Sequence, residues 1–323
     1  LVRSRGLGDV YKRQVVTGAG ISSYVARLFH INQSDRMLLL ACACAAALAA
    51  IFKVPLAGIL FAIEVFGLDL TLSSLLPLFI ASLSGVLTSY MFFGNAALLP
   101  IQINGSFLMR NLPFYLLLGG VGGIMSAYFT FVYEKINQFF SKLSSPYLRI
   151  LIGGIVLGLL VFLMPPLYGE GHEVINHLKE GHPELSLSSN IFGWHLENPW
   201  VVIFLLGGLV LFKVVATSVT FGAGGVGGIF SPMLFMGGVM GNCFARIINQ
   251  LDFLPYKLPL ANFTLIGMTA LMTGVLHAPL TAIFLIAEVT GGYVLFVPAM
   301  LTAVVSFAIA KYFNKYSILS LIH

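Results

Sequence analysis

A ten-residue segment occurs twice in this chain, and the repeat constrains the fold more than any other feature. The copies are PLAGILFAIE at residues 55–64 and PLTAIFLIAE at residues 279–288, an offset of 279 − 55 = 224. Each copy follows a Gly/Ala-rich apolar segment and precedes another apolar run, which contains Pro77 or Pro298. A duplicated module with Pro- and Gly-interrupted hydrophobic segments is typical of transport proteins that bind their substrate between two halves.

The composition excludes a water-soluble globular fold. Charged residues make up 9% of the 323 residues and hydrophobic residues make up 58%, whereas an ordinary soluble domain is about 25% charged. The net charge of +5 is not gathered in a Lys/Arg stripe with interleaved aromatic residues, so no nucleic-acid partner is expected. We therefore expect one large membrane domain that is surrounded by the lipid bilayer.

The apolar segments are continuous rather than alternating, which predicts helices and not the strands of a barrel. The expected fold class is all-α, a polytopic membrane protein with repeats and broken or re-entrant helices. Some segments are too short to cross: the twelve residues 55–66 would extend about 18 Å, against a hydrocarbon core of about 30 Å. The expected apolar segments are 15–29, 38–52, 54–66, 72–93, 113–133, 148–164, 199–220, 228–250, 260–276, 278–290 and 294–313.

Residues 165–198 are a polar interval that holds five of the twelve acids and four of the seven histidines. This composition predicts a solvent-exposed link between two halves. His172 and Glu173 approach a zinc-protease pattern, but the i+4 position is Asn176, and the next histidine, His177, falls off the required helix face. We therefore expect a solvated loop there, without a metal.

The three cysteines, Cys42, Cys44 and Cys243, lie in apolar runs without Cys or His at metal-ligand spacing. We interpret them as small packing residues. Neither a metal nor any other cofactor is expected.

The duplication extends upstream of the ten-residue segment. Residues 18–22 (GAGIS) match residues 237–241 (GGVMG) at an offset of 237 − 18 = 219, and an Ala-Arg pair follows both. The same offset projects residues 228–232 back onto residues 9–13, which share neither their Gly nor their Pro. The first repeat therefore lacks a counterpart of this loop.

Both ends of the chain differ in composition from the rest. Residues 1–14 are polar and basic and resemble translated library-adapter sequence, and residues 320–323 look similar. We expect both to be non-native, with a membrane domain at residues 15–319. Within it we expect the remainder of the first repeat at 15–164, the polar link at 165–198 and the second repeat at 199–319.

A glycine-rich loop at residues 220–232 joins one apolar helix to the start of another. Glycines remove Cβ atoms and let the backbone approach a ligand, and Pro232 suits the first turn of a helix. The N–H groups of Ile229 and Phe230, at the positive end of the helix dipole, would form an anion site without a full positive charge. This neutrality suits transport, because a buried Lys or Arg would hold the anion too tightly for rapid release.

Two other interpretations of this loop exist. A phosphate cradle is excluded, because no Gly-Lys-Ser/Thr follows and no βαβ pattern surrounds the loop. A close-packed glycine turn between two membrane helices stays open.

On these residues the chain resembles the family of CLC chloride channels and chloride/proton exchangers. Residues 228–232 (GIFSP) match the family's G-x-F-x-P anion loop, residues 55–64 match its equally distinctive partner segment, and Tyr316 resembles the tyrosine whose hydroxyl donates to the central anion. A tyrosine at a helix end is also typical of the membrane interface. The resemblance covers residues 15–319 and implies a homodimer with one anion pathway per subunit, built from inverted repeats and several broken helices. The anion-binding residues it implies are Gly228, Ile229, Phe230, Ser231, Pro232 and Tyr316.

The chain also departs from the family pattern. The family's first anion loop and its gating-glutamate motif both precede the sequence present here, and alignment places the missing glutamate opposite Tyr11. Val65 stands where many proton-coupled members carry an acid, so no proton pathway is expected. Glu64 and Glu288 occupy equivalent positions on short apolar helices, where an ionisable group is costly. We interpret both as structural, capping or bonding nearby backbone, and not as catalytic.

The leading functional interpretation is movement of chloride or a similar small inorganic anion, through a channel or a proton-coupled exchanger. The alternative is a cation-coupled transporter of an organic solute, which would need a larger cavity and a substrate-paired charge. An intramembrane hydrolase is not favoured, because His277 has no Ser or Cys elbow beside it. We expect a multi-pass protein of the plasma (inner) membrane of a prokaryote that is not an enzyme.

Overall fold

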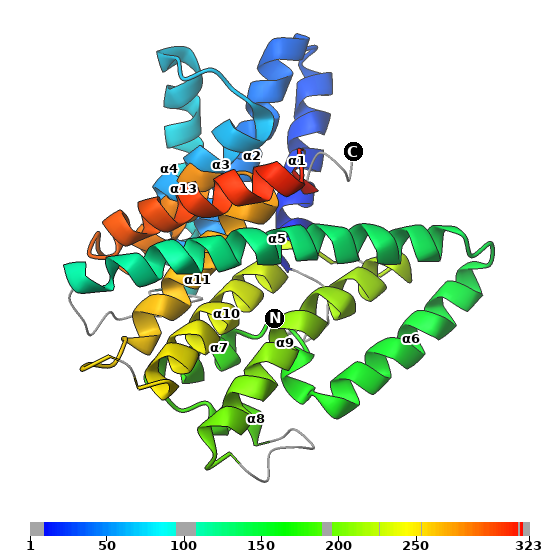
Figure 1. Ribbon diagram of the computed structural model, residues 1–323. Coiled ribbons are helices and arrows are strands. Elements are labelled where there is room, and N and C mark those ends of the chain that lie inside the picture. The colour runs from blue at the N-terminus through cyan, green and yellow to red at the C-terminus, as the bar shows by residue number, and fades with distance from the viewer. Residues whose placement is uncertain are drawn as a thin grey trace. The chain divides into compact units, whose positions relative to one another are not determined.

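The structure is a computed structural model that describes residues 10–94, 108–188, 196–225, 227–252, 254–315 and 317–318 (Figure 1). Within these residues the chain forms α-helices and short 3-10 helices, without a strand. The longer helices are α1 (Val10–Leu28), α2 (Gln33–Phe52), α3 (Pro55–Phe66), α4 (Leu72–Phe93), α5 (Leu112–Ser141), α6 (Pro146–Leu163), α7 (His172–Glu180), α9 (Pro199–Gly222), α10 (Phe230–Gln250), α11 (Leu260–Leu276), α12 (Pro279–Val289) and α13 (Phe296–Phe313). The shorter elements are η1 (Met109–Asn111), η2 (Pro165–Leu167) and α8 (Glu184–Leu187).

Each predicted apolar segment corresponds to one of these helices, which confirms the all-α membrane fold. The largest differences are at α1 and α2, which begin five residues before the predicted starts, and at α5, which continues to Ser141. In the described part of the chain, six helices are long and apolar enough to cross a membrane, namely α2, α4, α5 with η1, α6, α9 and α13. The α3 and α12 helices have only 12 and 11 residues, as predicted for helices that end within the membrane.

The helices group into two compact units that do not follow chain order. The smaller unit comprises Val10–Gln102 and Ala278–Phe296, and therefore contains α1 to α4 and α12. The larger unit includes Ile103–His277 and Val297–His323, and therefore contains α5 to α11 and nearly all of α13.

Helix α2 is the centre of the smaller unit and packs against α1, α3 and α4. A Cβ added at Gly58 of α3 would lie 2.6 Å from the Ala45 carbonyl oxygen, and one at Gly85 of α4 would lie 2.5 Å from that of Ala46. Because lipid tails are as apolar as the side chains, helices in membranes associate through such close backbone packing. The alanine-rich sequence of α2 therefore explains why three helices approach it.

The core of the larger unit is α11, whose residues from Asn262 to Leu276 are all buried. Helix α10 packs along it, and α5 lies across α9 and α11 (Figure 1). A Cβ at Gly237 of α10 would lie 2.5 Å from the Gly267 carbonyl oxygen, and one at Gly241 would overlap the Phe263 carbonyl oxygen. Small residues thus fix how α10 crosses α11.

The same crossing occurs in the smaller unit, between α1 and α2. A Cβ at Gly18 would lie 3.4 Å from the Ala43 carbonyl oxygen. Gly18 is the counterpart of Gly237 by the offset 237 − 18 = 219, and Ala43 is the counterpart of Gly267 by 267 − 43 = 224. Both repeats therefore build one helix pair from the same sequence positions.

The turn after this helix pair is also repeated. Lys53 follows α2 with φ +60°, and His277 follows α11 with φ +58°, at an offset of 277 − 53 = 224. Both residues end their helix in the left-handed conformation that non-glycine residues seldom adopt. His277 is thus a helix end, and its ring packs edge-to-face on Phe307 at 5.6 Å.

The prediction of a solvated loop at residues 165–198 is wrong for much of that interval, because α7 packs against α10 and α11. Its residues Val174, Ile175 and Leu178 are buried, which is the spacing of an amphipathic helix. The Nδ2 atom of Asn242 on α10 donates to the Leu178 carbonyl oxygen at 3.1 Å and so ties the two helices together. The prediction relied on composition, and the polar residues between these apolar positions make the interval polar on average.

Candidate functional site

The glycine-rich loop interrupts the larger unit between α9 and α10. Helix α9 ends at Gly222, Gly224 has φ +90°, and α10 begins at Phe230 after the N-terminal cap Ile229. Pro232 occupies the third position of α10, where a missing N–H removes no hydrogen bond within the helix. The predicted break between the two helices is therefore present. One uninterrupted helix through this loop would have contradicted the prediction.

The start of α10 is inside the protein and not on the lipid surface. Gly228 and Pro232 are buried, and Ile229, Phe230 and Ser231 are only 7%, 9% and 1% exposed. The N–H groups of a first helical turn point out of the end of the helix and carry the positive end of its dipole. The backbone here thus presents partial positive charge to the interior of the larger unit.

The segment that precedes α7 touches this helix start. The Ser231 hydroxyl donates to the Glu170 carbonyl oxygen at 3.4 Å. Gly171 has φ +78°, and a Cβ there would overlap the ring of Phe235 on α10. The glycine is therefore required both for the backbone conformation and for the close approach.

Sequence reasoning missed a buried lysine beside this segment. Nζ of Lys213, in the middle of α9, donates to the carbonyl oxygens of Leu167 at 3.0 Å and Gly169 at 2.8 Å, and lies 4.6 Å from the centre of the Phe235 ring. A lone lysine within an apolar span was the available signal, since such groups are costly and are retained for a purpose.

Tyr316 lies outside the described residues. Val65 is a partly buried residue of α3 in the smaller unit, next to Glu64. Of the predicted anion-binding residues, the structure describes residues 228–232. They form one continuous segment at the start of α10.

The two repeated glutamates cap each other's helices in the smaller unit. The Glu288 carboxylate accepts from the N–H groups of Leu56 at 3.0 Å and Ala57 at 2.8 Å, in the first turn of α3. The Glu64 carboxylate accepts from the N–H groups of Leu280 at 2.9 Å and Thr281 at 2.8 Å, and from the Thr281 hydroxyl at 2.5 Å. The predicted structural role of both residues is confirmed.

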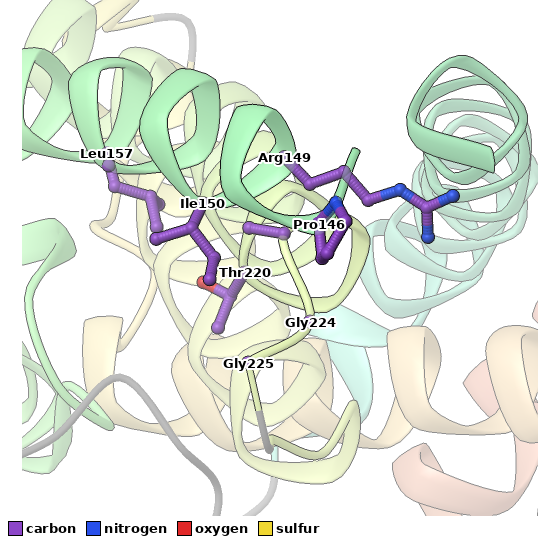
Figure 2. A pocket seen from close by; sticks show the side chains of 9 residues that line it. Pro146, Arg149, Ile150, Leu157, Thr220, Gly224 and Gly225 are labelled. Atoms are coloured by element: carbon purple, nitrogen blue, oxygen red, sulfur yellow. The ribbon is translucent and has the colours of Figure 1, made fainter. Parts of the chain in front are cut away.

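A cavity of about 560 Å³ lies between the start of α6 and the end of α9, and Gly224 and Gly225 form part of its wall (Figure 2). The Arg149 side chain extends away from the other lining side chains in Figure 2, and its Nε donates to the Leu143 carbonyl oxygen at 2.8 Å. The Thr220 hydroxyl donates to the Ala216 carbonyl oxygen at 2.8 Å. No lining charge in this view is directed into the cavity, so we assign it no ligand.

No group of three or more His, Cys, Asp or Glu side chains that could hold a metal is present among the described residues. Within the interval predicted to be a loop, His172 Nε2 lies 3.1 Å from the Glu170 carboxylate.

Comparison with known proteins adds to this geometry. A family model described as voltage gated chloride channel matches residues 14–311 of the chain. An H(+)/Cl(-) exchange transporter ClcA of Klebsiella pneumoniae subsp. pneumoniae is 30% identical over 318 residues, which are 95% of this chain and 63% of the relative. A voltage-gated ClC-type chloride channel ClcB of Citrobacter koseri is 28% identical over 288 residues, which are 87% of this chain and 63% of the relative. The chain thus spans less than two-thirds of the length of these curated relatives, whose names describe transport proteins and not enzymes.

Solved structures support the fold. A slow cyanobacterial Cl-/H+ antiporter matches with a TM-score of 0.79 and 23% identity over 98% of this chain and 71% of that one. A CLC-type fluoride/proton antiporter matches with a TM-score of 0.74 and 22% identity, over 98% and 72% of the two chains.

Proposed function

Because this chain belongs to the voltage gated chloride channel family, we propose that the protein transports chloride or a similar small inorganic anion across a membrane. It is a multi-pass membrane protein with six helices, among those described, that can cross the bilayer. We further propose that it functions as a homodimer in the plasma membrane of a prokaryote. Bacterial relatives named as transporters and channels support the proposed anion transport in a prokaryotic membrane, whereas the homodimer is what the family resemblance implies.

The observation that carries this proposal is the buried, interrupted start of α10. Gly228 has no Cβ to block a ligand, and Ile229 and Phe230 place N–H groups at the positive end of the helix dipole. Partial charges bind an anion tightly enough for it to enter the site, but weakly enough for it to leave again quickly. We assign anion binding to residues 228–232, with the Tyr316 hydroxyl as a further donor.

Whether transport is passive or coupled to protons depends on residues outside this loop. The relatives include proteins named as exchangers and as channels, so both modes fit the family. Val65 supplies no proton-accepting group beside Glu64. We propose that proton coupling through this position is absent.

The test is anion flux from liposomes that contain the complete gene product, with Cl⁻, Br⁻, NO₃⁻ and F⁻ offered separately. We expect flux of at least one of these anions. Failure to transport any of them, by protein that is shown to be folded, would contradict the proposed function.

The site assignment is tested by Gly228→Val, which places a branched side chain where the anion must approach the backbone. We expect the substitution to weaken anion binding by at least about 1.4 kcal/mol, which corresponds to a tenfold change in affinity. Flux should fall accordingly. The matched control is Gly207→Val on α9, where an added Cβ meets nothing within 4 Å. Wild-type flux in the Gly228 variant would show that this loop is not on the pathway.

A further inference from the structure

Lys213 is a charged residue in a place where charge is expensive. It is the one charged residue of α9, and it is only 3% exposed. Burial of an ammonium group is costly unless its donors are satisfied. The helix is otherwise apolar and long enough to cross the membrane, so an apolar side chain at this position would avoid that cost.

The structure shows what satisfies the ammonium group. Its hydrogen bonds to Leu167 at 3.0 Å and Gly169 at 2.8 Å both end on backbone carbonyl oxygens of one short segment, residues 167–171. The face of the Phe235 ring, 4.6 Å away at its centre, takes the remaining side of the cation. Lys213 therefore joins α9 to this segment and to α10.

The same segment contacts the first two turns of α10. The Glu170 carbonyl oxygen accepts from the hydroxyl of Ser231 at 3.4 Å, and Gly171 lies against Phe235. Ser231 is the residue after Phe230, and Phe235 is one turn further along the helix. A shift of residues 167–171 would therefore move the surroundings of the proposed anion-binding backbone.

We propose that Lys213 is a positioning residue for anion transport. Its ammonium group holds residues 167–171 against α10 and so fixes the orientation of the first-turn N–H groups at Ile229 and Phe230. This inference rests on the proposed function, because it assigns Lys213 to the same site. Lys213 acts through backbone and ring contacts, and the proposal does not require it to touch the anion.

The test compares wild type, Lys213→Met and a control, Lys135→Met, in the complete gene product reconstituted in liposomes. Methionine keeps an unbranched side chain only one atom shorter, and it removes the charge and the N–H donors. Lys135 is an exposed residue of α5 in the same unit. Flux is measured against chloride concentration, and the melting temperature of each protein is measured separately.

For Lys213→Met we expect the chloride concentration at half-maximal flux to rise about tenfold, in the range of effects of residues that couple to a site without touching it. The control should match wild type. A residue with only a structural role would lower the melting temperature and the amount of folded protein but leave the half-saturating concentration unchanged. That second pattern would overturn the proposal.

Should Lys213→Met fail to fold, Phe235→Leu decides the question, because it removes the ring face and leaves the lysine in place. We expect a higher half-saturating concentration in this variant too, and a wild-type value would overturn the proposal. Absence of flux in the wild-type protein would instead contradict the proposed function, so the two failures are distinguishable.

Discussion

At the residue scale, Glu64 and Glu288 show how the fold accommodates acids in short apolar helices. Each carboxylate accepts hydrogen bonds from N–H groups in the first turn of the helix that carries the other glutamate. Pro55 and Pro279 open these helices, so the first N–H groups to be satisfied belong to the two residues that follow each proline. The negative charge is placed at the positive end of a helix dipole, where it is stabilised.

This pairing predicts the effect of Glu288→Gln and of Glu64→Gln. The amide retains one oxygen acceptor where the carboxylate offers two, so one N–H of the partner helix loses its acceptor. We expect each substitution to lower the free energy of unfolding by about 1–3 kcal/mol. Thermal unfolding in detergent measures this, with Glu134→Gln on α5 as the control. Unchanged melting in both variants would show that the caps do not contribute to stability.

Sequence reasoning predicted the role of these two glutamates because both repeats keep the residue. It missed Lys213 because the partners of that lysine are backbone oxygens 46 and 44 residues away. No side-chain pattern in a sequence marks which carbonyl groups a folded chain will place together.

At the level of helices, the crossing of α10 and α11 fixes the position of the interrupted helix α10 in the larger unit. Gly237 and Gly241 are one turn apart on α10 and face Gly267 and Phe263 of α11. With no Cβ atoms on these glycines, the two backbones meet directly. The crossing therefore holds the start of α10 in the interior of the larger unit.

We predict that Gly241→Ala is destabilising, although alanine favours a helix. Its methyl group would overlap the Phe263 carbonyl oxygen, and overpacking of this kind costs about 1–3 kcal/mol. The control, Gly207→Ala on α9, meets nothing within 4 Å and should gain up to about 1 kcal/mol from helix propensity. Melting temperatures that shift in the same direction in both variants would refute this explanation of the crossing.

The positions of the helices were predictable because continuous apolar segments have few alternatives in a membrane. The α7 helix was not predicted, since it is short and lies among acids and histidines. Its buried residues Val174, Ile175 and Leu178 become visible only when spacing is considered before composition.

At the scale of the whole molecule, the repeats and the compact units divide the chain differently. Helix α12 belongs to the second repeat in sequence, yet it belongs to the same unit as α1 to α4 and pairs with α3. The reciprocal caps require these two helices to run antiparallel, because the C-terminal end of each lies at the N-terminal end of the other. The sequence predicted the duplication, but not that helices 224 residues apart would pair.

Val65 leads to a prediction for the complete protein. Without an acid at this position, a chloride gradient should not drive proton uptake into liposomes, although chloride itself moves. Simultaneous recording of chloride and pH in one preparation measures the coupling. Sustained proton movement against its own gradient would contradict the uncoupled mode and place the proton route at another residue.

In the proposed transport site, backbone N–H groups at the start of α10 bind the transported anion. Anomalous diffraction from crystals of the complete protein grown in bromide tests this directly. We expect a bromide peak within hydrogen-bonding distance of the N–H groups of Ile229 and Phe230. Bromide found only elsewhere in the protein, at a concentration that saturates transport, would contradict it.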